Sequence, residues 1–224
     1  MSTVSVVDVA KRYQLGKQEV VALDNINLSI EAGEFTAIAG PSGSGKSTLL
    51  NLIGCIDTPD RGAIIINGTD VSRQTPDELA DYRANTIGFI FQTFNLLPVL
   101  TALENVEYPL LHRKDVSKQE RHERVMHFLD VVGLASFAGH RPNELSGGQR
   151  QRVAIARALA THPSIVLADE PTANLDHKTG QGVLDLMKAI NRDSKTTFIF
   201  STHDAKVMQI ADRVVNMGDG RIIA

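Results

Sequence analysis

The sequence has a single cysteine, Cys55, no tryptophan and no long run of apolar residues. One cysteine excludes an intrachain disulfide and favours a reducing compartment, and we expect Cys55 to be a buried, inert thiol in an apolar helix. A membrane-spanning helix needs about 18 consecutive apolar residues, so none is expected. The first residues lack a basic stretch followed by an apolar core, and they predict no secretory signal peptide.

An excess of charge of one sign is missing too. The chain carries 23 Lys and Arg against 26 Asp and Glu, which gives a net charge of −3. This balance predicts neither a basic surface for nucleic acid nor a disordered chain. With 224 residues, the chain is long enough for one large α/β domain or two small ones. We expect a cytoplasmic protein that reaches a membrane only through a partner.

A glycine-rich segment, residues 40–47, matches the pattern G-x-x-x-x-G-K-[ST] of a phosphate-binding loop. The apolar residues 35–39 before it predict a buried strand, and residues 47–53 after it have helical character. The pattern requires this context, because free amides and the dipole at a helix start favour an anion. The positions expected to hold nucleotide phosphates are Gly40, Pro41, Ser42, Gly43, Ser44, Gly45, Lys46, Ser47 and Thr48.

Two of these residues have side chains suited to a specific task. Lys46 is long enough to reach the terminal phosphates, and the hydroxyl of Ser47 is a ligand for Mg²⁺. The glycines let the backbone approach an anion more closely than a Cβ would allow. The alternative is a glycine turn that matches by chance, and the flanking strand and helix argue against it.

Two carboxylates, Asp169 and Glu170, follow the apolar run 165–168. Such a run is typical of a strand covered by helices on both faces, and ligands bind at the carboxyl ends of these strands. We therefore expect Asp169 to hold Mg²⁺ through water, and Glu170 to orient or deprotonate an attacking water. The alternative is an exposed acidic end of a loop.

Two more buried strands are predicted at residues 87–91 and 196–201, and they end next to Gln92 and His203. A single histidine is usually unremarkable. At the carboxyl end of a strand in this kind of sheet, however, it faces the ligand crevice. His203 is therefore a candidate site residue.

The N-terminal part predicts an antiparallel β-layer packed on this core. Its expected strands are residues 4–9, 20–23 and 26–30, with a polar loop at 11–17. Tyr13 lies in that loop, where an aromatic side chain is more often a surface anchor than a base-stacking residue. At the other end of the chain, residues 213–223 predict a hairpin.

The middle of the chain changes character. No strand is indicated between about residues 93 and 157, whereas residues 101–113 and 117–132 have helical spacing. We therefore expect a helical subdomain inserted into the α/β core. Its entry carries five apolar residues that fit either the core of the subdomain or a surface patch for a partner. They are Phe94, Leu96, Leu97, Pro98 and Leu100.

The segment 145–149, with the sequence LSGGQ, precedes a strongly helix-forming stretch at 150–160. A serine and two glycines before a helix can bind an anion by the same physics as the phosphate loop. They also make an ordinary helix cap. Both interpretations stay open here, and the local physics favours the cap.

With these segments in order, the whole chain resembles the nucleotide-binding subunits of ATP-binding cassette (ABC) transporters. The resemblance rests on the phosphate loop and LSGGQ together with Tyr13, Gln92, Asp169, Glu170, Asp176 and His203. It implies a P-loop NTPase core with a mostly parallel sheet, an N-terminal antiparallel β-subdomain and an inserted α-helical subdomain. Residues 1–224 would form one ABC ATPase domain, with its core in 1–92 and 162–224 and its helical subdomain in about 93–161.

The resemblance also implies ATP and Mg²⁺ as cofactors and assigns a role to each motif. Two copies would dimerise head to tail, so that the phosphate loop of one and the signature of the other enclose each ATP. Tyr13 would stack on adenine, Glu170 would polarise water and His203 would steady the γ-phosphate. Gln92 would touch Mg²⁺ and sense the membrane partner. Asp176 would cross the interface, and phosphate contacts across it would come from Ser146, Gly147, Gly148 and Gln149.

Four segments resemble the lipoprotein-release and macrolide-export group within the family. They are residues 50–57, 91–98, 101–106 and 171–176, the last with Asn174 where other cassettes commonly have serine. The implied partner is a transmembrane permease, with the ATPase peripheral on the cytoplasmic face of the inner membrane. The transported substrate is not encoded here. The chain ends soon after its predicted hairpin, so the regulatory domain of sugar importers is not expected.

Two other functions fit the sequence less well. A soluble cassette ATPase acting on ribosomes or DNA would carry two cassettes in one chain or a long coiled coil, and this sequence indicates neither. A P-loop kinase would need a lid for its acceptor substrate, and LSGGQ argues against it. The sequence therefore predicts an ATPase, converting ATP and water to ADP and phosphate, that drives a transporter.

Overall fold

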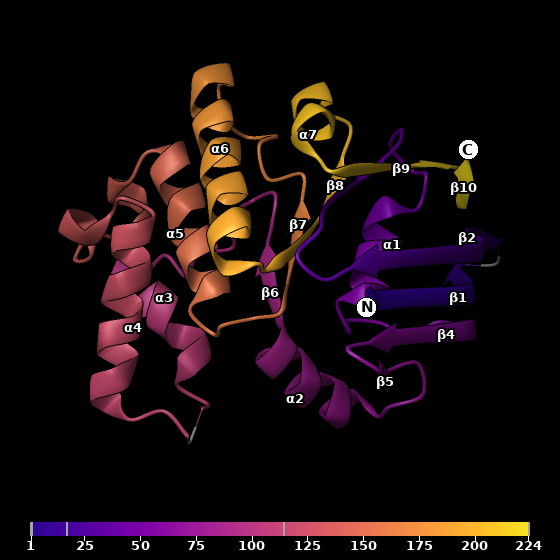
Figure 1. The fold of residues 1–224 in the computed structure, drawn as a ribbon, viewed down its shortest axis with the longest axis horizontal. Coiled ribbons are helices and arrows are strands. Elements are labelled where there is room, and N and C mark those ends of the chain that lie inside the picture. Colours follow the sequence, from indigo (N-terminus) through magenta and orange to yellow (C-terminus); the bar gives the residue numbers. More distant parts are fainter. Residues whose placement is uncertain (1, 17, 114, 224) are drawn as a thin grey trace.

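The computed structural model describes residues 2–16, 18–113 and 115–223, which form two sheets with helices around them (Figure 1). The larger sheet has the strand order β10-β9-β3-β8-β7-β6. All of its strand pairs are parallel except β10 with β9, which form the predicted hairpin. Its strands are β3 (Phe35–Ala39), β6 (Ile87–Ile90), β7 (Ile165–Asp169), β8 (Thr197–Thr202), β9 (Arg213–Gly218) and β10 (Arg221–Ile223).

A second, antiparallel sheet has the order β2-β1-β4-β5. Helix α1 (Lys46–Ile53) contacts strands of both sheets, and its buried residues Leu49, Leu52 and Ile53 belong to the core that they share. The predicted antiparallel layer packed on a parallel core is confirmed. The strands of this layer are β1 (Ser2–Leu15), β2 (Gln18–Glu31), β4 (Arg61–Ile66) and β5 (Thr69–Asp70).

Between β6 and β7 the described residues form helices and no strand, as the helical spacing predicted. Figure 1 shows this part on the side of the parallel sheet that lies away from the antiparallel sheet. It comprises α3 (Ala102–Glu107), α4 (Lys118–Val131) and α5 (Gly147–Leu159), with 3₁₀ turns at Tyr108–Leu110, Ala135–Phe137 and Pro142–Glu144. The remaining helices are α2 (Pro76–Thr86), α6 (His177–Ser194) and α7 (Ala205–Ile210).

Side-chain caps fix where most of these helices begin. Thr75 accepts a hydrogen bond from the amide of Glu78, whose carboxylate accepts one from the amide of Thr75, so the two residues form a capping box. Thr101 and Glu104 form the same arrangement at α3. Each such cap stabilises a helix by about 1 kcal/mol, because it satisfies amides that have no partner within the helix.

Two local predictions in the N-terminal sheet were wrong. Of the loop predicted at residues 11–17, residues 11–15 lie in β1 and residue 17 lies outside the described residues, while β2 joins the two short strands predicted at 20–23 and 26–30. Pairing between β1 and β2 satisfies the backbone along a sequence too polar to indicate a strand. Register shifts in β1 accommodate the irregular sequence, and Asp8 there has a φ of 50°.

Cys55 lies just beyond α1 and not inside it, with a left-handed φ of 54°. Its side chain is buried, and burial raises the pKa of the thiol to about 11. Because the thiolate is the reactive form, Cys55 is inert near neutral pH, as its apolar setting predicted.

The topology gathers one group of the predicted site residues at one edge of the parallel sheet. Ala39 at the end of β3 pairs with Thr202, and Asp169 at the end of β7 pairs with Ser201. The phosphate loop, Glu170 and His203 follow directly after these strands. The carboxyl ends of parallel strands meet at one edge, which is where open α/β sheets bind their ligands.

The position of α5 on this sheet depends on Gly88 in β6, where an added Cβ would lie 2.5 Å from the backbone oxygen of Ala158. A carbonyl cannot rotate away, so α5 would have to shift. We expect Gly88→Ala to lower the free energy of unfolding by about 1–3 kcal/mol in urea titrations. Gly139→Ala, where nothing lies within 4 Å of the added atom, is the control and should change stability by less than about 0.5 kcal/mol. Equal effects of the two substitutions would contradict this account of the packing.

Candidate functional site

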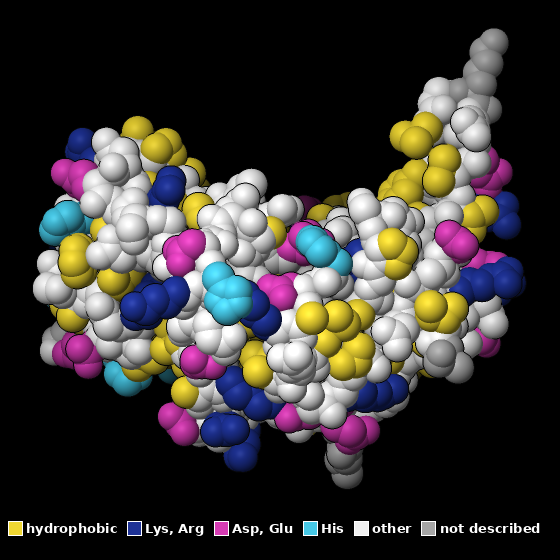
Figure 2. Space-filling model, turned by 90° about the horizontal axis from the view of Figure 1, so that it is seen from above, with side chains coloured by type: hydrophobic (Ala, Val, Ile, Leu, Met, Phe, Trp, Pro, Cys, Tyr) yellow, Lys and Arg dark blue, Asp and Glu magenta, His cyan; other side chains and the backbone are white. Residues whose placement is uncertain are grey.

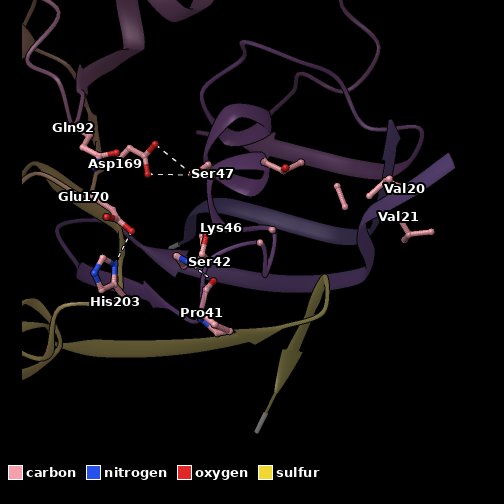
Figure 3. Close-up of a pocket in the computed structure, with 14 residues that line it drawn as sticks. Val20, Val21, Pro41, Ser42, Lys46, Ser47, Gln92, Asp169, Glu170 and His203 are labelled. Carbon is pink, nitrogen blue, oxygen red and sulfur yellow. Dashed lines mark hydrogen bonds and ion pairs between the residues drawn. The ribbon is translucent and has the colours of Figure 1, made fainter. Parts of the chain in front are cut away.

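A cavity of about 680 Å³ opens at this edge of the sheet (Figure 3). Its size is typical of small-molecule sites. Most of its wall comes from the phosphate loop and from the residues that follow β6, β7 and β8. The lining residues are Val20, Val21, Ala22, Pro41, Ser42, Gly43, Gly45, Lys46, Ser47, Thr48, Gln92, Asp169, Glu170 and His203.

The phosphate loop bends around the cavity because two glycines adopt left-handed backbone conformations. Gly43 has a φ of 80° and Gly45 a φ of 97°, and a Cβ on Gly45 would lie 2.5 Å from the carbonyl oxygen of Ala22. Gly45 also precedes the first residue of α1, and no side chain caps this helix. The start of α1 therefore fits an anion.

Lys46 supports this assignment. Its side chain is buried, and its Nζ donates to the carbonyl oxygens of Gly40 and Pro41, both at 2.8 Å. Among the described residues, no carboxylate lies within ion-pair distance of Nζ. A buried ammonium held only by carbonyls fits a phosphate, which would supply the missing negative charge.

Asp169 and Ser47 lie next to each other at the cavity, joined by dashed lines in Figure 3. The Ser47 hydroxyl lies 3.3 and 3.4 Å from the two carboxylate oxygens, and Ser201 donates a further hydrogen bond to Asp169. No group of three or more His, Cys, Asp or Glu side chains gathers as a metal cage in the described chain. One carboxylate and one hydroxyl fit Mg²⁺, which takes most of its other ligands from phosphates and water.

Glu170 and His203 form a second pair at the cavity. The His203 Nδ1 lies 2.8 Å from the Glu170 Oε1, and the imidazole is mostly exposed. Glu170 has a left-handed φ of 44°, held by a hydrogen bond from its amide to the Ser201 carbonyl. A non-glycine residue in this conformation is uncommon, and such residues cluster at functional sites.

Three of the positions predicted to contact nucleotide within a single chain do not line the cavity. The carbonyl oxygen of Gly40 accepts a hydrogen bond from the cavity residue Lys46, and the Ser44 side chain is buried. Tyr13 donates through its hydroxyl to the Asp57 carboxylate at 2.9 Å, and burial, followed by this bond, raises the pKa of the phenol. Tyr13 pairs with Val20, which does line the cavity.

The end of the cavity near Val20 and Val21 is apolar. Both valines are exposed on β2, and Leu15 is exposed on β1. In the space-filling view, an arm that carries hydrophobic side chains rises at one side of a hollowed face (Figure 2). No motif in the sequence marks Val20 and Val21 as site residues, because only the fold of β2 brings them to the phosphate loop.

The LSGGQ segment lies apart from this cavity within the chain. Ser146 caps α5, accepting from the amide of Gln149 at 3.3 Å, while Gln149 accepts from the amide of Ser146 at 2.8 Å. A Cβ on Gly148 would lie 2.3 Å from Thr179 in α6, and Asp176 caps that helix. Hydrogen bonds from Thr179 lower the pKa of Asp176. The signature and Asp176 thus form a second group at the adjoining starts of α5 and α6.

The apolar residues at the entry of the helical part were predicted to belong either to its core or to a surface patch, and each alternative holds for some of them. Leu96 packs against the core of the helical part, whereas Leu97 and Pro98 are exposed. Val99 beside them is 72% exposed. The segment therefore contributes both to the core and to an apolar surface. In the described part of the chain, no helix is long and apolar enough to cross a bilayer.

Known proteins resemble the chain over nearly its whole length. A sequence profile for the ABC transporter domain matches residues 23–173. The chain is 49% identical to MJ0796, an uncharacterized ABC transporter ATP-binding protein of Methanocaldococcus jannaschii, over 96% of this chain and 93% of that protein. It is also 49% identical to the macrolide export ATP-binding/permease protein MacB of Rhodopirellula baltica, over 95% of this chain but 31% of MacB.

Solved structures lead to the same family. The dimeric post-hydrolysis state of MJ0796 bound to ADP and Pi matches with a TM-score of 0.90 at 47% sequence identity. The match covers 99% of this chain and 97% of that one. From the profile, the relatives and the fold together, we conclude that the chain belongs to the ABC transporter family, as an ATP-binding ATPase subunit.

Proposed function

We propose that this ATPase binds Mg-ATP in the cavity, dimerises head to tail around two nucleotides and drives a membrane permease. One observation carries the proposal: two helices of the chain begin with a glycine-rich segment of the kind that binds phosphate, and the two segments do not line the same cavity. The start of α1 lines the cavity, while the start of α5 lies elsewhere. A second copy can supply its α5 to the cavity of the first, which makes each site complete only in the dimer.

Each residue of the cavity then has a task in nucleotide binding. The loop amides and Lys46 hold the phosphates, with Lys46 exchanging its carbonyl partners for phosphate oxygens. Tyr13 stacks on adenine beside Val20. Mg²⁺, when bound, neutralises phosphate charge, and Ser47, Gln92 and Asp169 are the residues that would hold it, Asp169 through water.

Glu170 acts as the general base. Its carboxylate lies at the cavity and is held towards His203, so it can accept a hydrogen bond and then a proton from water. His203 is exposed enough to turn from Glu170 towards the γ-phosphate. Gln92 orients the water and the metal, and reports the state of the permease.

The dimer would complete each site with Ser146, Gly147, Gly148 and Gln149 of the second copy, and Asp176 would cross the interface. Nucleotide bound between two copies stabilises the dimer by mass action, and its hydrolysis weakens the dimer. The dimeric MJ0796 structures support this arrangement, because their chain matches this one almost completely.

The permease is of the lipoprotein-release or macrolide-export type, and the ATPase lies on the cytoplasmic face of the inner membrane. Similarity to the ATP-binding part of MacB supports this assignment. The alternative is a soluble ABC ATPase that acts on ribosomes or DNA. The net charge of −3 disfavours it, because nucleic-acid partners are met by basic surfaces.

Glu170→Gln tests the base. The amide keeps the size of the side chain but accepts no proton, so kcat should fall at least about a hundredfold while ATP affinity stays near the parent value. Light scattering should show an ATP-dependent dimer that the parent does not accumulate. Glu123→Gln, on the exposed face of α4, is the matched control and should leave turnover unchanged. If Glu170→Gln hydrolyses ATP as fast as the parent, Glu170 is not the general base. If its mass is unchanged at saturating Mg-ATP, the proposed dimer does not form.

Ser146→Arg tests whether the signature acts across the dimer. The bulky cation should block dimerisation yet leave the ATP affinity of the isolated subunit within about twofold, because Ser146 lies away from its own cavity. Ser117→Arg is the control, since it removes the cap of α4 in the same way but far from the interface. Fluorescent-nucleotide binding and light scattering separate the two effects. A large loss of affinity in the monomer would place the signature in the chain's own site.

The permease assignment is tested by affinity purification of the tagged chain from membranes in mild detergent. We expect it to retain a membrane permease with a large extracytoplasmic domain, and to lose it at high detergent concentration. Co-sedimentation with ribosomes that resists high salt would favour the soluble alternative instead.

A further inference from the structure

The segment that carries Gln92 adopts an unusual backbone. It follows β6 without regular structure, and two consecutive residues, Phe94 and Asn95, have left-handed φ values of 63° and 47°. Neither is glycine, and such a conformation persists only where surrounding groups hold it. Gln92 therefore sits two residues from Phe94, whose bulky side chain disfavours the conformation that it adopts here.

Arg157 on α5 holds this turn. Its Nη2 donates to the carbonyl oxygen of Phe94 at 2.8 Å, and its Nη1 donates to that of Asn95. No carboxylate of the described residues forms an ion pair with this guanidinium, and burial lowers its pKa. A second arginine of the same helix, Arg150, lies 5.2 Å from the centre of the Phe94 ring. Burying part of a cation that has no carboxylate partner costs free energy unless its N–H groups find acceptors. Here the acceptors are the carbonyl oxygens of the two residues with left-handed φ.

Asn174 holds the segment from the other side. Its Nδ2 donates to the carbonyl oxygen of Gln92 itself at 2.8 Å. Asn174 lies in the loop between Glu170 and Asp176, and its side chain is exposed. Gln92 is thus tied through its own carbonyl to the loop that leaves β7, and through the next residues to α5.

We propose that Asn174 and Arg157 are positioning residues for hydrolysis, which fix Gln92 at the cavity without touching nucleotide. The inference rests on the proposed role of Gln92. It also ties Gln92 to both partner-facing groups of the chain, since Arg157 shares α5 with Ser146 and Asn174 lies two residues from Asp176. A shift of either group is passed to Gln92 through one side chain.

Asn174→Ala tests the proposal, with Asn174→Asp as the variant that keeps the shape but replaces the donor by a charged acceptor oxygen. We expect both to lower kcat roughly threefold to tenfold, the loss of one hydrogen bond that positions a reacting group, with the KM for ATP unchanged. The thermal midpoint should stay near that of the parent because Asn174 is exposed. Asn85→Ala is the matched control, since Asn85 is also exposed and its amide also donates to one carbonyl, that of Asp81 within α2.

The distinguishing readout is a double-mutant cycle with Gln92→Ala. If Asn174 acts through Gln92, Asn174→Ala should cause no further loss of kcat once Gln92 is truncated. Hydrogen exchange of the nucleotide-free protein is the second readout. Residues 92–97 should exchange faster in Asn174→Ala, and also in Arg157→Lys, whose single ammonium cannot serve both carbonyls.

Either of two results would overturn the proposal. One is that the losses of kcat from Asn174→Ala and Gln92→Ala add independently in the double mutant. The other is that Asn174→Ala keeps both the kcat and the hydrogen-exchange rates of the parent. Arg157→Lys retains the charge and most of the packing, so it is used in place of a truncation to alanine, which would remove both. The proposed function is judged separately by the parent. If the parent hydrolyses ATP and Glu170→Gln dimerises while Asn174→Ala matches the parent, only the positioning role fails.

Discussion

The site depends on one helix being left without a cap. Thr75, Thr101, Ser117, Ser146, Asp176 and Asp204 each accept from an amide at the start of α2 to α7. At α1 the residue in this position is Gly45, which has no side chain to do so. The amides of the first turn are the donors that an anion needs, and a serine or aspartate there would compete for them. In the described chain, a stabilising contact worth about 1 kcal/mol is thus omitted at the one helix that faces the cavity.

Two cations without carboxylate partners serve this site in different ways. Lys46 and Arg157 both donate to backbone carbonyls, and neither forms an ion pair among the described residues. The Lys46 ammonium is a compact point charge at the cavity, so it can exchange its carbonyls for phosphate oxygens. The Arg157 guanidinium is planar, and two of its N–H groups are bonded to the carbonyl oxygens of two residues with left-handed φ. These bonds stabilise the turn and are not exchanged for phosphate. The difference lies in side-chain geometry and in access to the cavity.

The two halves of the proposed site come from different parts of the fold: the phosphate loop precedes α1 beside the parallel sheet, and the signature precedes α5 in the helical part. Ser146 already caps α5 in the single chain, which agrees with what local physics predicted for this segment. In the proposed dimer, the same segment would contribute to nucleotide binding by being presented to the cavity of the second copy. A residue can therefore be structural within its own chain and functional across an interface, and the two roles need not conflict.

Much of the fold follows from short-range patterns in the sequence. The phosphate loop, the apolar strands, the capping boxes and the helical insert each depend on residues close together in the chain, and order and spacing identified the family. Long-range pairing decided the rest. The parallel register set Ser201 against Asp169, and the loop of Asn174 met the carbonyl of Gln92. These contacts join residues many positions apart, and no local pattern records them, because the backbone atoms that they use are common to every residue type.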